Sequence, residues 1–233
     1  LKYSNLGYQL TDNEWIGKEE LTSVDLTYVW DNTKWSYTYP VRGSRLYLKY
    51  QTSPLSKYQT NSLSFDGRIY KPLFNGLSLL VRNFSGLSWG KDNHKFYLGS
   101  SPSFYTSDNF NVNQYYQSQN FNEYYFSAHV MPIRGVPFMY KIGDNVMAWN
   151  FELRAPFLLY YFPAVKWIGQ INAVAFLDVG VTWNKHEQFP LISHSNNWIN
   201  REEGGTAEGW VMSYGWGPRF IFLGLPFQIN YAW

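Results

Sequence analysis

The 233-residue chain contains no cysteine, and its charged residues are few and nearly balanced, with 19 Lys and Arg against 17 Asp and Glu. The absence of cysteine excludes disulfides, cysteine-based zinc sites and thiol nucleophiles together. The charges nearly balance and no block of basic residues occurs, so the sequence gives no sign of a nucleic acid or other polyanion as a partner. The sequence also carries no nucleotide-binding motif, and we expect no cofactor.

The chain lacks a hydrophobic run long enough for a transmembrane helix. Its most apolar stretch, Ala155 to Ile168, contains Pro156, Pro163 and Lys166 and falls short of the roughly 20 residues that a spanning helix needs. The mean hydropathy of −0.36 also argues against a helical membrane protein. A β-barrel is not excluded, because only alternate residues of its strands face lipid. No signal peptide precedes Leu1, so we expect the sequence to start inside a longer chain.

Aromatic residues are abundant instead, at 21 % of the chain. They favour β-structure and, at membrane interfaces, aromatic girdles. The clearest element, Ile171 to Asn184, alternates between an apolar row and a row that carries Asp178, which is the pattern of a β-strand. It is long for a strand of a soluble domain, which has about five or six residues, and suits a tilted membrane strand of roughly nine to eleven.

Similar alternation elsewhere predicts about nine strands of an all-β, antiparallel transmembrane β-barrel. The two longest polar segments, Lys91 to Gly143 and Lys185 to Glu208, are expected to be loops on the same side of the membrane. Loops of this length are generally functional or disordered. Besides Ile171 to Asn184, strands are expected at residues 20–30, 43–51, 61–70, 77–89, 144–157, 209–222 and 227–233, with a weaker one at 1–10.

Alternation also predicts which side chains face lipid in the strands on either side of residues 158–170. A register slip of one residue would place charged side chains in the hydrocarbon of the membrane. For a basic residue at mid-depth this destabilises the barrel by about 2 to 4 kcal/mol. The rows expected to face lipid are Met147, Trp149, Phe151 and Leu153 in one strand and Leu177, Val179, Val181 and Trp183 in the other, with Asn150, Glu152, Asp178 and Thr182 facing the lumen.

Two other classes of protein fit the same periodicity. A soluble carbohydrate-binding β-sandwich would bind sugars by aromatic stacking, with Glu152 and Asp178 resembling the paired carboxylates of a glycosidase. A plain outer-membrane porin is the other alternative. Several apolar rows begin or end in tryptophan, as at Trp30 and Trp233, which suits interfacial belts and favours a membrane barrel. We expect no enzyme, since the histidines lie in loops without ligand spacing: His94, His129, His186 and His194.

Arg134 lies in the long polar segment, while Glu152 and Asp178 project from adjacent strands toward the same polar face. A carboxylate in a crowded lumen needs a partner, and one arginine fork can serve two carboxylates. Spacing alone nevertheless favours a simpler arrangement, in which Glu152 pairs with the nearby Arg154 and Arg134 is solvated.

Five short motifs follow one another along the second half of the chain. They are Ile133-Arg134-Gly135; Gly143-Asp144-Asn145; Phe151-Glu152-Leu153-Arg154-Ala155-Pro156; Phe176-Leu177-Asp178-Val179-Gly180; and Ser213-Tyr214-Gly215-Trp216-Gly217 followed by Leu225-Pro226. In this order they make the segment from Leu77 to Trp233 similar to the C-terminal half of the barrel in the superfamily of BamA and the two-partner-secretion translocators. Pro40-Val41-Arg42-Gly43 resembles a turn of the same barrel, which extends the similarity faintly to about residue 20.

The resemblance implies that the loop folds back into the lumen and that Arg134 binds Asp178, with Glu152 nearby. Val136 stands where the family usually has an aromatic residue, and Phe138 is expected to take that role. The family barrel has about sixteen strands, so we expect residues 1–233 to be one barrel domain, incomplete at both ends. The implied site residues are Arg134, Gly135, Glu152 and Asp178, together with Phe176 and Gly180 of the strand motif.

The resemblance also implies a role in inserting outer-membrane proteins or in translocating polypeptides across the outer membrane. The expected location is the cell outer membrane, and the expected partners are its lipid, polypeptide substrates and accessory envelope proteins or lipoproteins. Insertase and secretion pore both stay open, because the family's lateral gate uses the first and last barrel strands.

Overall fold

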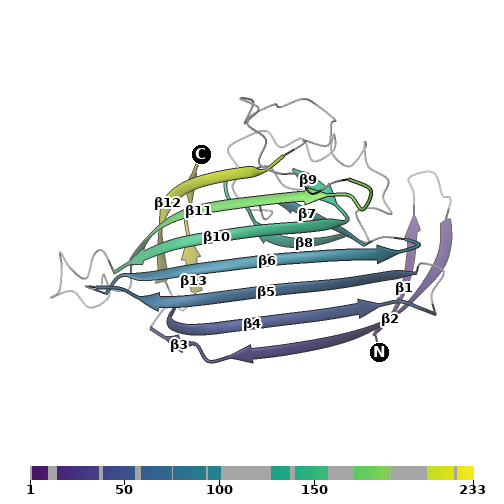
Figure 1. Cartoon of the computed structure of the whole chain (residues 1–233), viewed down its shortest axis with the longest axis horizontal. Coiled ribbons are helices and arrows are strands. Elements are labelled where there is room, and N and C mark those ends of the chain that lie inside the picture. Colours follow the sequence, from purple (N-terminus) through teal and green to yellow (C-terminus); the bar gives the residue numbers. More distant parts are fainter. Residues whose placement is uncertain are drawn as a thin grey trace.

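The computed structural model describes residues 2–9, 15–36, 39–55, 59–74, 76–92, 94–100, 127–136, 140–156, 171–187, 189, 209–222 and 225–233. Every regular element in these ranges is a β-strand. None of the same ranges contains a helix that is long and apolar enough to cross a membrane. The all-β fold predicted from alternation is confirmed (Figure 1).

Most strands form one large sheet, in which each strand runs antiparallel to its neighbours and the order follows the chain. The path is β1 (Lys2–Gln9), β2 (Trp15–Asp31), β4 (Pro40–Thr52), β5 (Thr60–Pro72), β6 (Ser78–Gly90), β10 (Asn145–Ala155), β11 (Asn172–Trp183), β12 (Val211–Phe222) and β13 (Leu225–Gln228). Two short strands lie off this path: β3 (Lys34–Trp35) pairs with β4, and β14 (Tyr231–Ala232) pairs with β12.

The large sheet is curved, as Figure 1 shows, and within the described residues its two end strands β1 and β13 do not pair with each other. Strong twist and curvature are the ordinary behaviour of long antiparallel strands, and closure into a barrel depends on them. The strands β2, β4, β5 and β6 have 17, 13, 13 and 13 residues, well beyond the usual five or six. They are more than long enough to cross a membrane at a tilt, which takes about nine to eleven residues.

A second, three-stranded sheet lies within the segment from Lys91 to Gly143. It has the order β8 (Ser127–Pro132), β7 (Lys95–Gly99) and β9 (Lys141–Gly143), with β8 parallel and β9 antiparallel to β7. The expectation that this whole segment is a loop is therefore wrong. Its strands have only three to six residues, too few for alternation to separate them from a polar loop.

The two faces of the large sheet differ as alternation predicts. On β10, Phe151 and Leu153 are exposed on the outer face, whereas Asn150 and Glu152 are buried on the inner face. The outer face is mostly apolar, with Asn83 and Ser85 of β6 as polar members of it, and a register slip of one residue would expose the charged row there instead. Other exposed apolar residues of the outer face are Leu26, Tyr28, Trp30, Leu48, Ile69, Leu87, Trp89, Met212, Tyr214 and Trp216.

Val181 is the exception to the predicted outward row, because its side chain is 0 % exposed. It precedes Trp183 in the outer row of β11, and continuing the register of β11 with β12 by one position places Trp210 opposite it. The ring of Phe189 packs edge-on against both Trp183 and Trp210, with centroid distances of 5.0 and 6.2 Å. Side chains of the protein therefore cover this end of the outer face, and Val181 contacts protein there in place of lipid.

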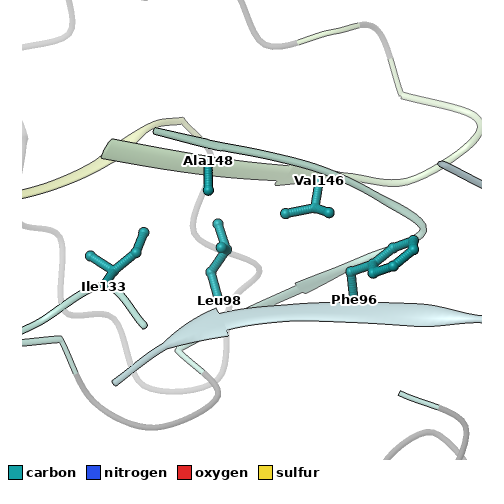
Figure 2. Close-up of a cluster of buried hydrophobic side chains, with 5 residues drawn as sticks. All are labelled: Phe96, Leu98, Ile133, Val146 and Ala148. Carbon is teal, nitrogen blue, oxygen red and sulfur yellow. The ribbon is translucent and has the colours of Figure 1, made fainter. Parts of the chain in front are cut away.

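A cluster of buried apolar side chains joins the small sheet to the inner face of the large one. Figure 2 shows Val146 and Ala148 pointing from β10 toward Phe96, Leu98 and Ile133. All five side chains are at most 2 % exposed. Burying a large aliphatic or aromatic side chain contributes about 1.5 to 3 kcal/mol, so this cluster is a substantial part of what holds the segment inside the curved sheet.

The C-terminal strand, predicted as one element, is divided into β13 and β14. The pairings of β12 with β13 and with β14 share one register, so no residue is inserted at the break. Pro218 lies opposite the break, where Ile229 donates its N–H to the Pro218 carbonyl at 3.1 Å. Because proline has no N–H, the reciprocal bond cannot form and the ladder is interrupted.

Candidate functional site

Arg134 is positioned by the turn that follows β8. Its neighbour Ile133 donates its backbone N–H to the Gly99 carbonyl at 3.1 Å, and Ser100 donates to the Val136 carbonyl at 3.0 Å. Both bonds fix the turn to the end of β7. Gly135 has φ +78°, a left-handed conformation that glycine adopts without strain. The small sheet therefore determines where the guanidinium of Arg134 lies.

The Arg134 side chain is bound to two carboxylates of the inner wall. Its Nε and Nη2 donate to Oδ2 and Oδ1 of Asp178 at 2.8 and 2.7 Å, and its Nη1 donates to Oε1 of Glu152 at 2.8 Å. The backbone N–H of Arg134 adds a further bond to Asp178 Oδ2 at 3.1 Å. Asp178 is 0 % exposed and Arg134 only 8 %. The structure thus brings together Arg134, Asp178 and Glu152, which spacing alone would have left apart.

Glu152 is shared by three arginines. Besides Arg134, it accepts Nη2 of Arg219 at 2.7 Å on Oε1, and Nε and Nη2 of Arg154 at 2.9 and 2.7 Å on Oε2. Arg154 also lies over the rings of Tyr39 and Tyr70 at 5.2 and 5.7 Å. The simpler pairing of Glu152 with Arg154 therefore exists, but together with the Arg134 contact and not in place of it.

Each of the four oxygens of Asp178 and Glu152 accepts two hydrogen bonds. The donor besides the arginines is the side-chain amide of Asn150, which binds Asp178 Oδ1. A catalytic carboxylate pair must present oxygens to a substrate, and this pair presents none. Charge-assisted hydrogen bonds of this kind are short and strong, and they make the cluster suited to holding the segment against the wall.

Phe176 and Gly180, the other residues of the strand motif, flank Asp178 on the same face of β11. The guanidinium carbon of Arg134 lies 3.5 Å from the centre of the Phe176 ring, a cation–π contact. A Cβ at Gly180 would come within 2.6 Å of Ile133 Cδ1 and 2.9 Å of Leu98 Cδ1. The glycine is therefore needed for close approach of the segment to the wall, and Phe176 covers the guanidinium.

Gly135 lies against the last strand of the chain. A Cβ built on it would be 2.6 Å from Cβ of Ala232. Val136, which stands where the related family has an aromatic residue, is partly buried and packs against the apolar cluster of Figure 2. Phe138 lies outside the described residues.

A separate ion pair fixes the segment at the rim of the sheet. Lys95 of β7 lies 2.7 Å from Asp144, directly before β10, and donates to the Asn184 side chain at 3.4 Å. Asp144 also accepts the backbone N–H of Lys185 at 3.0 Å. These contacts place the starts of the two long polar segments at the same end of the sheet, as predicted.

Two groups in the cluster are not among the predicted site residues. Alternation predicts only that Asn150 faces the lumen, and it places Arg219 in the polar row of its strand. Arg219 pairs in register with Asn172 on the neighbouring strand and reaches Glu152 from there. Its position in the inward, polar row of this strand was the available signal.

No group of three potential metal ligands occurs among the described residues. His94 lies edge-on to Phe96 with ring centres 5.2 Å apart. Burial, with a smaller effect of the Lys49 charge, lowers the pKa of His94 to about 4. His186 is exposed, whereas the side chain of His129 and the whole of His194 lie outside the described residues.

The family follows from the match of a family model. The model of the Omp85 superfamily domain matches residues 2–233. The chain belongs to the Omp85 superfamily. Its resemblance to BamA and the two-partner-secretion translocators is thereby confirmed at the level of the superfamily. No curated protein matches the chain in a sequence comparison. Omp85 proteins are in general outer-membrane β-barrels that insert or translocate proteins, and the all-β antiparallel sheet described above agrees with that architecture.

Proposed function

We propose that this chain is part of a barrel in the cell outer membrane that inserts outer-membrane proteins or translocates polypeptides across that membrane, and that the Arg134 segment is a lumen lock required for this activity. We define the lumen lock as Arg134, Gly135, Glu152 and Asp178. Polypeptides are the proposed substrates, and accessory envelope proteins or lipoproteins are proposed partners.

The buried binding of Arg134 to Asp178 and Glu152, in a chain of the Omp85 superfamily, carries the proposal. An ion pair buried this deeply is expensive to desolvate and is weak evidence for a purely stabilising role. A buried ion pair is useful where a segment must occupy one defined place in the lumen. A lock of this kind is also reversible, because its bonds exchange with water once the segment moves.

The two other classes of protein are less well supported. A plain porin needs an open lumen, whereas the apolar cluster of Phe96, Leu98 and Ile133 fills the space beside β10 and β11. A soluble sandwich needs a second sheet over the outer apolar face, whereas in the described part of the chain the small sheet packs on the inner face and the outer aromatic row is exposed.

The test is reconstitution of the full-length protein into liposomes. An unfolded outer-membrane protein is added outside, and its insertion is measured as protease-resistant, folded barrel; a secreted passenger polypeptide serves as the second substrate. The wild-type protein is expected to accelerate at least one process, and Arg134→Ala is expected to lose most of that acceleration. Arg42→Ala, which removes an exposed arginine of β4, should act like wild type.

Two results would contradict the proposal. A wild-type protein that accelerates neither insertion nor translocation would refute the proposed function. Full activity of Arg134→Ala, with the barrel correctly folded, would show that the lumen lock is not needed for it.

A further inference from the structure

A second charged cluster lies on the inner face of β4, β5 and β6, next to the lumen lock, since Arg82 pairs in register with Asn150. Asp66 accepts Nε and Nη2 of Arg68 at 3.0 and 2.7 Å, and Nε and Nη2 of Arg82 at the same two distances. One carboxylate therefore serves two guanidinium groups. The two arginines therefore exceed the single carboxylate by one positive charge.

Arg45 adds a third guanidinium at the same level of the wall. In the register of the sheet Arg45 pairs with Arg68, and Arg68 pairs with Arg82. Arg45 forms an ion pair with Asp31, whose Oδ2 lies 3.7 Å from Arg45 Nε, beyond hydrogen-bond distance. Asp31 Oδ1 is occupied by the N–H and hydroxyl of Thr33. The side chain of Arg45 is 42 % exposed, so its donors face the lumen.

These side chains surround a hollow of about 250 Å³, lined by Arg45, Tyr47, Asp66 and Arg68. Pockets for drug-sized ligands have about 300 to 1,000 Å³, so the hollow suits a single side chain or a small anion. Guanidinium forks match the two oxygens of a carboxylate, and the Tyr47 ring provides an apolar surface for the carbon stem that carries it.

We propose that Arg45, Arg68 and Tyr47 form a binding site for the carboxylate side chains of a polypeptide in the lumen. The inference deepens the proposed function and rests on it, since it names the substrate feature that the wall recognises. Three arginines face two aspartates here, Asp31 and Asp66, and a site with an excess of one charge sign concentrates ligands of the opposite sign. The arginines would hold an acidic segment of a substrate polypeptide at this level of the wall, because its charge is opposite to theirs.

Lys49 provides a matched comparison on the same strand and the same face. Its Nζ lies 3.0 Å from Asp25 and donates to Gln51 at 3.3 Å. Lys49 is therefore in direct contact with its carboxylate, whereas the ion pair of Arg45 with Asp31 is looser, at 3.7 Å. Removing Lys49 takes away the same charge as removing Arg45 but leaves the lining of the hollow unchanged.

The test measures binding of a hexaglutamate peptide, labelled with an uncharged dye, to the full-length protein in lipid nanodiscs by fluorescence anisotropy. Hydrogen bonds to charged groups are worth about 1.5 to 3 kcal/mol, so losing one fork should weaken binding about tenfold or more. Arg45→Gln is expected to raise the Kd by that factor, Arg45→Lys by less, and Lys49→Gln not to change it. A hexaglutamine peptide should not bind.

Equal affinity of wild type and Arg45→Gln would overturn the proposal, as would an equal loss in Lys49→Gln. Binding of inorganic phosphate at this site without binding of hexaglutamate would overturn the assignment to polypeptide carboxylates. The liposome assay separates the two proposals: an active wild-type protein that does not bind hexaglutamate refutes only this site. An inactive protein whose peptide binding still depends on Arg45 refutes only the proposed function.

Discussion

Replacing Arg134 by alanine tests how strongly the buried ion cluster holds the segment to the wall. The truncation removes three side-chain hydrogen bonds, two to Asp178 and one to Glu152. Asp178, at 0 % exposure, then keeps only the Asn150 amide and the backbone N–H of residue 134. Glu152 still has Arg154 and Arg219. The expected loss of stability therefore comes mainly from the uncompensated charge of Asp178.

The size of the effect follows from the burial of the partner. Removing one member of a buried ion pair costs about 3 to 5 kcal/mol, because the other charge stays uncompensated, whereas an exposed pair is worth under about 1 kcal/mol. We expect Arg134→Ala to lower the free energy of unfolding by about 3 to 5 kcal/mol, and Asp178→Ala to lower it similarly. Together they should cost less than their sum, with a coupling of about 1 to 3 kcal/mol.

The assay is denaturant unfolding of the refolded full-length barrel in lipid vesicles, followed by tryptophan fluorescence. Arg134→Lys keeps the charge but loses the fork, and should fall between wild type and alanine. Arg42→Ala controls for loss of an exposed arginine. Additive effects of Arg134→Ala and Asp178→Ala, or a loss below about 1 kcal/mol for either, would refute the reasoning that the segment is bound through this pair.

Three further changes test neighbouring parts of the structure. Glu152→Gln leaves three arginines together without their shared carboxylate, so the free energy of unfolding should fall by about 3 to 5 kcal/mol; an unchanged value would show that water already compensates the arginines. Gly180→Ala should cost about 1 to 3 kcal/mol through overpacking, and adding Ile133→Val, which removes the nearest clashing atom at 2.6 Å, should restore much of it; no rescue would contradict that contact. Because the folded pKa of His94 is about 4 and the unfolded value about 6.5, the unfolded chain binds more protons between these values, so stability should be lost as pH falls from about 6.5 toward 4. A His94→Phe protein should lose less over that range, and identical pH profiles of the two proteins would contradict the burial of a neutral imidazole.

Alternation located the long strands because each has one face in an apolar environment and one in a polar interior. The nine strands along the path of the large sheet agree with the number expected, and β10 and β11 begin and end close to the predicted residues. Boundaries were less accurate where the pattern weakens. The second strand begins at Trp15 and not at Glu20, and β4 begins at Pro40 because its first residues pair with β3.

The small sheet could not be predicted from periodicity. Its parallel pair, β7 and β8, joins segments that lie on either side of residues 100–126. Such pairing depends on the inner wall on which the sheet packs and not on a local pattern. The burial of Val181 is of the same kind, since alternation cannot predict that Trp183, Phe189 and Trp210 meet at that end of the sheet.

The lumen lock was found through motif order and not through spacing. Arg134 and Asp178 are 44 positions apart, and nothing in the local sequence connects them. The local pair of Glu152 and Arg154 is real, but a carboxylate has two oxygens and accepts several donors, so that pair does not exclude Arg134. Local reasoning treated the two arrangements as alternatives, whereas the structure contains both.

The central claim is that the Arg134 segment lies inside the barrel and is bound to its wall. A cryo-electron microscopy structure of the full-length protein in lipid nanodiscs tests it directly. We predict density for the Arg134 guanidinium within hydrogen-bond distance of both Asp178 and Glu152, with Ile133 packed over Gly180. A structure with the segment outside the barrel and Arg134 in solvent, far from both carboxylates, would contradict the account.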